Sequence, residues 1–266
     1  MNSLSFIDDP PRDGALNMAL DHFLSLQIRQ SGMAGVLRLY RWERPTLSCG
    51  FHQRAERRID FAGCQRFSVD VVRRPTGGRE LLHDGDLSFS LVISRGLGYE
   101  NTDGPRKFFY HAGKIIIGGL RSLGIEAALI EGSKPGGHSR FAPCLAAFSQ
   151  FEIVSAGRKL VPIAQRVYQD VILAHGSIPL ANTKIPTAEL LQLKEKAKVQ
   201  QLIDKASVSI GELLPGEVDL DLLKESLLTN FGKIFGGQVI PKELSGEELA
   251  HAANDRLNWV INKKGK

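Results

Sequence analysis

Residues 71–93 constrain the fold of this chain most strongly, because one apolar run is followed by a glycine-bearing loop and then by a second apolar run. This order predicts a strand, a tight loop and another strand. The loop over residues 73–79, here called the arginine loop, carries Arg73, Arg74 and Arg79 around the pair Gly77–Gly78. Glycines let a backbone approach a ligand or take up positive φ, and arginines bind anionic or carbonyl-bearing groups. The alternative interpretation is an ordinary hairpin turn with solvated arginines.

Length and composition indicate a globular protein with a substantial core. The chain has 266 residues, of which 42% are hydrophobic and 24% charged. No apolar run approaches the roughly 20 residues that span a bilayer. Residues 1–9 lack the basic start and apolar centre of a signal peptide. We therefore expect a cytoplasmic protein that does not bind a membrane.

The charged residues and the cysteines narrow the possible partners. The net charge is +5, but the basic residues are spread along the chain without interleaved aromatics, so a nucleic acid is not expected. A mildly basic surface suits an acidic protein partner. Cys49, Cys64 and Cys144 lack the spacing of a metal site or a disulfide framework. We expect no metal, no cofactor and at least one free thiol.

The first two thirds of the chain alternate between strand and helix patterns. Helices are predicted over residues 15–28, 59–67 and 107–123, and strands over residues 36–41, 45–51, 69–72, 87–93, 125–130, 151–154, 159–164 and 171–178. Pairing of strand 69–72 with strand 87–93 would present the arginine loop at one end of a sheet. Pro162 predicts that its strand is interrupted or lies at a sheet edge.

The pattern of hydrophobic and charged residues changes after about residue 182. Residues 189–206, 220–235 and 246–261 all show helical periodicity with charged faces. The fold class is therefore predicted to be mixed α/β, with one domain over residues 1–182. Residues 183–266 are predicted to form a small helical appendage packed on that domain.

Several motifs in a consistent order resemble one known superfamily. They are Asn17-Met-Ala-Leu-Asp21, Leu39-Tyr-Arg-Trp42, the arginine loop with His83, Gly157-Arg-Lys159 with Ala164-Gln165, and His175-Gly-Ser177. Together they resemble the lipoate–protein ligase and octanoyltransferase superfamily, from near residue 5 to about residue 180. The resemblance implies a biotin/lipoate ligase-like catalytic domain with mixed sheets flanked by helices. It also implies an acyl-chain tunnel floored by a sheet, with the arginine loop as one wall.

The resemblance implies a set of site residues. The catalytic pair would be Cys144 and Lys159, because a cysteine precedes the Gly-Arg-Lys motif in the cysteine-dependent octanoyltransferases. Residues implied to contact the substrate are Arg73, Arg74, Thr76, Gly77, Gly78, Arg79, His83, Pro162, Ile163 and Ala164. A thiolate attacks thioesters readily, and a nearby ammonium stabilises it. Taken alone, a cysteine such as Cys144 is more often an inert buried thiol. His83 and His175 could each be a structural histidine.

One departure from the superfamily pattern affects the substrate. Relatives usually carry Lys-x-x-Gly-Ser-Ala-Gln, whereas this chain has Pro162 and Ile163 in place of Gly-Ser. Proline fixes φ and removes an N–H donor, and isoleucine adds bulk. We therefore expect the tunnel, or a backbone hydrogen bond to the acyl carbonyl, to differ here.

The function implied by the resemblance is octanoyl transfer in lipoate biosynthesis. A monomeric enzyme would take the acyl group from acyl carrier protein, hold it on Cys144, and pass it to a lysine of a lipoyl domain or of glycine cleavage H protein. Three alternatives stay open: an amidotransferase between lipoyl-type proteins, an ATP-dependent lipoate–protein ligase, and an inactive lipoyl-domain or acyl-chain binding protein.

Overall fold

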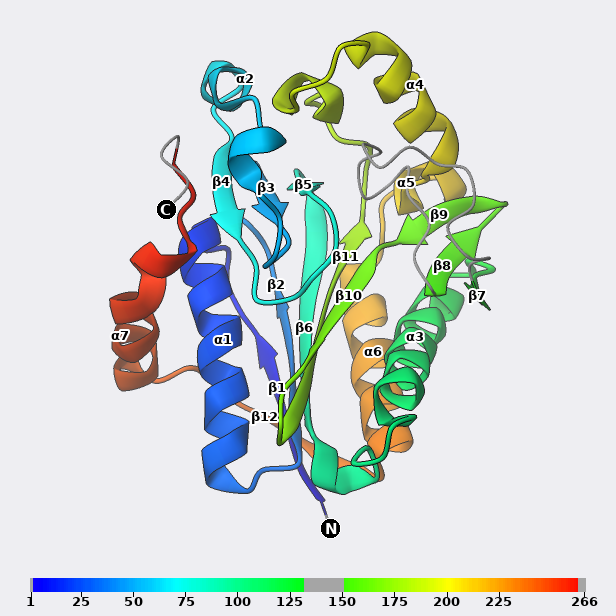
Figure 1. Ribbon diagram of the computed structural model, residues 1–266. Coiled ribbons are helices and arrows are strands. Elements are labelled where there is room, and N and C mark those ends of the chain that lie inside the picture. The colour runs from blue at the N-terminus through cyan, green and yellow to red at the C-terminus, as the bar shows by residue number, and fades with distance from the viewer. Residues whose placement is uncertain (1, 132–150, 263–266) are drawn as a thin grey trace.

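The computed structural model describes residues 2–131 and 151–262. A six-stranded mixed sheet forms its centre, with strand order β10-β11-β6-β2-β1-β12 (Figure 1). These strands are β1 (Asn2–Asp8), β2 (Gly35–Tyr40), β6 (Asp86–Ser94), β10 (Ile163–Val167), β11 (Val171–Pro179) and β12 (Gly237–Pro241). The predicted mixed α/β class is confirmed.

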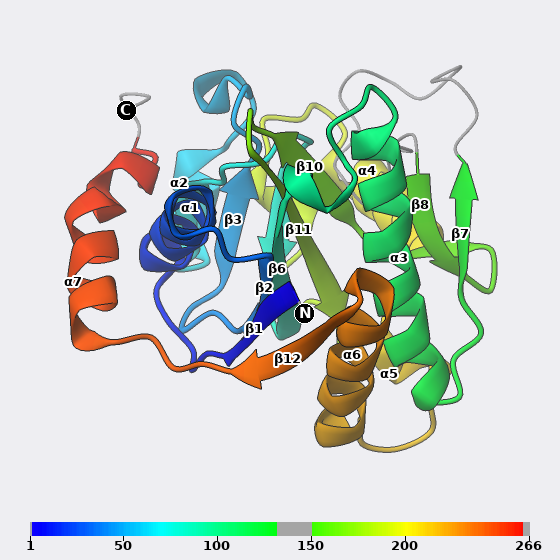
Figure 2. The same cartoon turned by 90° about the horizontal axis from the view of Figure 1, so that it is seen from below.

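Helices cover both faces of this sheet (Figure 2). On one face lies α1 (Gly14–Ser31), with α7 (Gly246–Asp255) packed outside it, and on the other lie α3 (Gly104–Ser122) and α6 (Leu220–Phe235). Asp13 caps α1 by accepting hydrogen bonds from the backbone N–H groups of Ala15 and Leu16. The molecule therefore has helix, sheet and helix layers.

The remaining elements form two smaller sheets and their covering helices. One sheet has the order β4-β3-β5 and the other β7-β8-β9. The strands are β3 (Thr46–Cys49), β4 (Asp70–Arg73), β5 (Leu81–His83), β7 (Ala128–Glu131), β8 (Phe151–Ser155) and β9 (Arg158–Val161). The helices are α2 (Phe61–Arg66), α4 (Lys196–Ala206) and α5 (Ile210–Leu213), with 3₁₀ turns η1 (Ala55–Arg57), η2 (Arg95–Leu97), η4 (Thr187–Leu190) and η5 (Arg256–Trp259).

The alternation of side chains in β6 explains the two faces of the main sheet. Leu87, Phe89 and Leu91 join the core under α3 and α6, while Ser88 and Ser90 point to the opposite face. Both serines are buried. The sheet face toward α1 is therefore polar near the start of β6, and this is where the site lies.

The predicted pairing of strand 69–72 with strand 87–93 is wrong. β4 instead pairs in parallel with β3, while β6 lies between β2 and β11. β6 is buried along nearly its whole length and therefore suits the centre of a large sheet, whereas β4 is short and begins at the exposed Asp70. The loop between β4 and β5 nevertheless lies at the end of a sheet.

Pro162 was predicted to interrupt its strand or to lie at a sheet edge. Pro162 separates β9 from β10, and β10 is an edge strand, so the prediction for this proline is confirmed.

The C-terminal part contains the predicted helix over residues 220–235, but also β12, which pairs with β1 and which helical periodicity did not indicate. The domain boundary at residue 182 stays a prediction. None of the helices within residues 2–131 and 151–262 is long and apolar enough to cross a membrane.

Candidate active site

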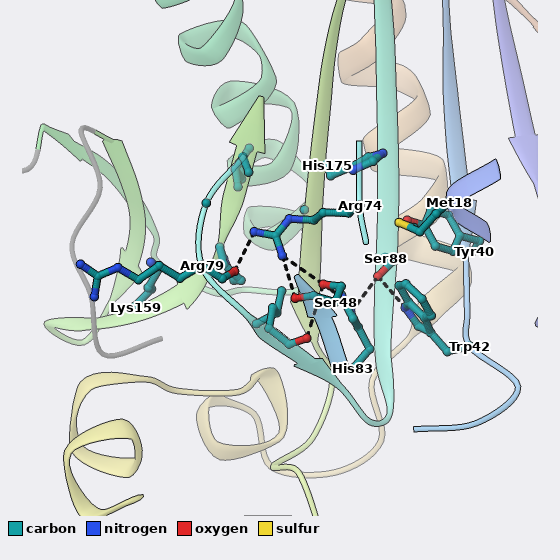
Figure 3. A pocket seen from close by; sticks show the side chains of 16 residues that line it. Met18, Tyr40, Trp42, Ser48, Arg74, Arg79, His83, Ser88, Lys159 and His175 are labelled. Carbon is teal, nitrogen blue, oxygen red and sulfur yellow. Dashed lines mark hydrogen bonds between the residues drawn. The ribbon is translucent and has the colours of Figure 1, made fainter. Parts of the chain in front are cut away.

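A cavity of about 190 Å³ lies between the main sheet and the loop that joins β4 to β5. Its wall combines apolar groups with a few polar side chains, which is the usual composition of a small-molecule site. In Figure 3, Lys159 and Arg79 lie at one end, and Met18, Tyr40 and Trp42 lie at the opposite end. The cavity therefore has a charged end and a largely aromatic and apolar end.

The cavity collects most of the site residues predicted from the sequence. Those that line it are Arg74, Gly78, Arg79, His83, Lys159, Pro162, Ile163 and Ala164. Arg73, Thr76 and Gly77 do not line it, although they lie in or next to the same loop. Cys144 lies outside the described residues. The two residues that depart from the superfamily pattern, Pro162 and Ile163, thus face the space where a ligand would lie.

Arg74 holds the arginine loop from inside. Its Nη2 donates to the carbonyls of Gly77 and Arg79, both at 2.7 Å, and its Nη1 donates to the Ser48 carbonyl at 3.0 Å. A Cβ on Gly78 would lie 2.7 Å from that same Nη2, and its φ is +91°. Glycine is therefore required at position 78 for the loop to fold back over its own arginine.

Arg73 supports a neighbouring turn rather than the cavity. Its Nη1 donates to the carbonyls of Gly50, Phe51 and Gln53 at 3.2, 2.8 and 3.0 Å. A Cβ on Gly50 would lie 2.2 Å from the Gly78 carbonyl oxygen, so this turn packs directly against the arginine loop. The two adjacent arginines thus brace two touching backbone segments.

Two side chains of the main sheet, Arg166 and His175, contact the arginine loop. Arg166 of β10 donates from Nη1 to the Pro75 carbonyl at 3.0 Å, and its guanidinium lies 4.0 Å from the centre of the Phe51 ring. Thr76 Oγ1 lies 3.3 Å from Nδ1 of His175 in β11. The loop is therefore attached to the strands that form the opposite wall of the cavity.

His83 belongs to a buried chain of polar groups. Its Nε2 lies 2.9 Å from Ser48 Oγ, and its ring stacks on Trp42 with centroids 4.1 Å apart. The Trp42 indole N–H donates to Ser88 Oγ at 2.9 Å. These contacts give His83 a fixed orientation in the cavity wall, whichever of its nitrogens carries the proton.

A second buried network lies beneath the apolar end. Asp21 of α1 accepts hydrogen bonds from Arg38 Nη1 at 2.8 Å and from the Tyr40 hydroxyl at 3.0 Å, and its Oδ2 lies 3.0 Å from His175 Nε2. Burial alone would raise the pKa of Asp21, but the charges of Arg38 and His175 lower it overall. An ionised Asp21 therefore fixes Tyr40 and His175 in the cavity wall.

Lys159 is the buried cation at the charged end. Its Nζ lies 2.8 Å from Oε2 of Glu152, and the two side chains are 4% and 1% exposed. The backbone carbonyl of Lys159 accepts a hydrogen bond from the N–H of Val208 at 3.0 Å, which ties β9 to the segment after α4. The lysine is thus held by both its side chain and its backbone.

Cys49 and Cys64 are the two cysteines among the described residues, and both are buried. Burial raises the pKa of each thiol to about 12. A thiol with such a pKa is a poor nucleophile at neutral pH, because the thiolate is the reactive form. Neither is therefore suited to covalent catalysis.

Sequence patterns alone did not identify part of the cavity wall. The additional lining residues are Met18, Tyr40, Trp42, Ser48, Leu81, Ser88, His175 and Gly176. The motifs over residues 17–21, 39–42 and 175–177 contain five of these residues but did not place them in the cavity. The signal that does place several of them together is the period-2 alternation of β2, β6 and β11. Because Tyr40 and Ser177 both pair with Ser88 in the sheet register, and His175 is two residues from Ser177, these side chains share one face.

The fold is shared with solved lipoate–protein ligases. Lipoate-protein ligase A bound with ATP matches with a TM-score of 0.76 and 19% identity, over 100% of this chain and 96% of that chain. A bipartite lipoate protein ligase from Thermoplasma acidophilum matches with a TM-score of 0.74 and 19% identity, over 96% and 91% of the two chains. At these identities the likeness establishes the class of fold, a lipoate–protein ligase catalytic domain.

Comparison with known sequences gives a more specific relationship than the fold alone. Residues 13–232 match the lipoyl protein ligase A/B catalytic domain, and the chain belongs to this family, as its motifs predicted. Octanoyltransferase LipM of Carboxydothermus hydrogenoformans is 34% identical over 252 residues, which are 93% of this chain and 92% of that protein. Octanoyltransferase LipM of Bacillus subtilis is 31% identical over 255 residues, covering 92% and 90% of the two chains. The predicted enzyme class, an acyltransferase, is confirmed.

Proposed function

We propose that this protein is an octanoyltransferase of lipoate biosynthesis that works through a thioester on Cys144. The donor would be octanoyl acyl carrier protein, and the acceptor a lysine of a lipoyl domain or of glycine cleavage H protein. The observation that carries the proposal is Lys159, a buried lysine at one end of a largely apolar cavity. Its relatives of 30–34% identity are named octanoyltransferases.

The cavity suits a medium acyl chain on chemical grounds. Met18, Leu81 and Ile163 contribute apolar surface to it, and each methylene removed from water contributes about 0.8 kcal/mol of binding. In this assignment the alkyl tail lies toward Met18, Tyr40 and Trp42. The reacting carbonyl then lies at the end where Lys159 is placed (Figure 3).

The first half-reaction would load the enzyme. The Cys144 thiolate attacks the donor carbonyl, a carbon–sulfur bond to Cys144 forms, and the bond to the phosphopantetheine sulfur breaks. Lys159 donates a proton to the departing thiolate. Backbone N–H groups near Gly77 and Gly78 are the proposed donors to the tetrahedral oxyanion, because preorganised amides stabilise the charge that develops there.

The second half-reaction would unload it. The acceptor lysine attacks the Cys144 thioester as a neutral amine, the carbon–nitrogen bond forms, and the Cys144 sulfur leaves. The nitrogen gives up one proton, which Lys159, neutral after the first step, accepts. Protons therefore balance over the cycle, and Lys159 carries one proton in each direction.

Transfer without nucleotide is the test of this proposal. Purified protein is mixed with octanoyl acyl carrier protein and an apo lipoyl domain in buffer free of ATP, and the acceptor is weighed by mass spectrometry. We expect octanoylated acceptor, because the thioester donor is already activated. A strict requirement for ATP with free octanoate or lipoate would instead indicate a ligase. Activity only with an acylated lipoyl-type protein as donor would indicate an amidotransferase, and binding without turnover an acyl-binding protein.

A further inference from the structure

Glu152 and Lys159 lie on adjacent strands of a small hairpin that carries one irregularity. Val154 pairs with Lys159, and the next pair is Ile153 with Val161, so Leu160 is an extra residue on β9. Leu160 and Val161 both enter the main core as a result, although neighbouring residues of a regular strand point to opposite faces. The bulge thus buries two consecutive apolar residues and leaves Lys159 on the other face.

Glu152 shares that face of the hairpin. It is two residues from Val154, the partner of Lys159, and is therefore a diagonal cross-strand neighbour within reach of a long side chain. The contact between Nζ and Oε2 is 2.8 Å, with both side chains almost completely buried. An ammonium and a carboxylate are costly to bury unless they are paired. Each group therefore supplies the countercharge that the other requires.

Other charged groups lie around the cavity and on the same hairpin. Arg74 and Arg79, from the loop after β4, also line the cavity and carry the same sign as Lys159. Arg158, next in sequence, pairs with Glu212 on an exposed surface at 2.9 Å. Glu152 contributes a carboxylate oxygen within ion-pair distance of Lys159 Nζ, at 2.8 Å.

We propose that Glu152 is a positioning residue for Lys159, an inference that rests on the proposed function of that lysine. The ammonium has three N–H bonds, and the contact to Glu152 fixes the direction of one of them. Because the three N–H bonds are arranged evenly around the Cε–Nζ axis, fixing one of them also fixes the directions of the other two. Proton transfer depends on such alignment, since a misplacement of about 1 Å can cost about 10²-fold in rate.

Two variants and one control test this role. Glu152→Gln keeps the size and a hydrogen-bonding oxygen but removes the charge, and Glu152→Asp keeps the charge but withdraws it by one methylene. Glu212→Gln removes the carboxylate that pairs with Arg158, an exposed contact between the same hairpin and α5. We expect kcat for octanoyl transfer to fall about 10- to 100-fold in Glu152→Gln with little change in KM. Glu152→Asp should recover part of the loss, and Glu212→Gln should match the wild type.

A spectroscopic measurement tests the pairing without any turnover. Protein labelled with ¹⁵N-lysine is examined for a slowly exchanging NH₃⁺ signal, assigned to Lys159 by its loss in Lys159→Arg. The signal should be present in the wild type and in Glu212→Gln, and should shift or vanish in Glu152→Gln. An unchanged signal would overturn the inference. If the wild type transfers no octanoyl group, the proposed function fails while this measurement still decides the pairing.

A double variant separates positioning from general destabilisation. In a Lys159→Ala protein, adding Glu152→Gln should cause no further loss of activity, because the residue through which Glu152 acts is already gone. A further tenfold loss in the double variant would overturn the positioning role. If Glu152→Gln does not fold, as judged by circular dichroism, the Glu152→Asp protein decides the question by its kcat and by its NH₃⁺ signal.

Discussion

His83 and Asp86 form a buried pair in which Nδ1 of the histidine lies 3.0 Å from Oδ2 of the aspartate. The same oxygen accepts hydrogen bonds from the hydroxyls of Ser88 and Ser177 at 2.8 and 2.6 Å. Burial alone would raise the pKa of Asp86, but His83 and the two hydroxyls lower it overall. An ionised Asp86 therefore joins β5, β6 and β11 beneath the cavity.

This pair predicts a pH-dependent stability difference. Asp86→Asn should lower the free energy of unfolding at pH 7 by about 3 kcal/mol, because the contacts of His83, Ser88 and Ser177 with a buried carboxylate are replaced by weaker contacts with a neutral amide. Because the folded-state pKa of Asp86 lies below its unfolded value, its contribution is complete above about pH 4 and is lost as the pH falls further. Urea titrations of both proteins at pH 7 and near pH 3 measure this. A difference that is the same at both values would contradict the prediction.

Replacing Lys159 tests its proposed role as proton carrier. Lys159→Ala should reduce turnover by about 10²- to 10⁴-fold, the range for losing a general acid–base group. Lys159→Arg should also fail, because a guanidinium stays protonated and cannot accept the proton of the attacking amine. Steady-state transfer assays on both variants check this. Near-normal rates for Lys159→Arg would show that a positive charge suffices.

Arg166 of β10 donates a hydrogen bond to the Pro75 carbonyl, and we predict that this contact holds the arginine loop against the main sheet. Arg166→Gln should speed tryptic cleavage after Arg79 by about tenfold or more, since a hydrogen bond from a charged group is lost and local opening becomes easier. Time courses analysed by mass spectrometry give the rate at this bond. Arg158→Gln, which removes an arginine from the exposed pair with Glu212, is the matched control. Equal rates in the two variants would show that Arg166 does not hold the loop.

Pro162 and Ile163 line the cavity and should influence acyl-chain preference. The double change Pro162→Gly with Ile163→Ser removes side-chain carbons, so the optimum should shift toward longer or bulkier groups, including lipoyl. One or two methylenes of changed fit correspond to roughly 10- to 200-fold in relative kcat/KM. The comparison uses carrier proteins charged with C6, C8 and C10 chains. An identical profile in both proteins would show that the pair does not set the length.

The local elements were largely predictable from the sequence, because they depend on short-range patterns. The helix in residues 15–28 and the strand in residues 171–178 follow from periodicity, and Pro162 correctly predicted an edge and an interruption. β1 and β12 were not predicted. They pair in parallel across more than 200 residues of sequence, and such long-range pairing leaves little local signal.

The site was predictable to the extent that its motifs lie in one loop and one strand junction. The motifs also included Tyr40 and His175, but they did not show that these side chains share one cavity wall with Ser88, because the three meet only through the sheet register. Glu152 did carry a signal, because it is a charged residue within the apolar run 151–154. Such a residue needs a partner when buried, but the bulge that brings Lys159 to it depends on tertiary packing.

Intact mass spectrometry tests the proposed acyl-enzyme most directly. Protein incubated with octanoyl acyl carrier protein, without an acceptor, should gain the mass of one octanoyl group, and hydroxylamine should remove it. Cys144→Ala should gain nothing, whereas a double Cys49→Ala and Cys64→Ala variant should still be labelled, because burial raises the pKa of both thiols to about 12. An octanoyl adduct that persists in Cys144→Ala would contradict the assignment of Cys144 as the nucleophile.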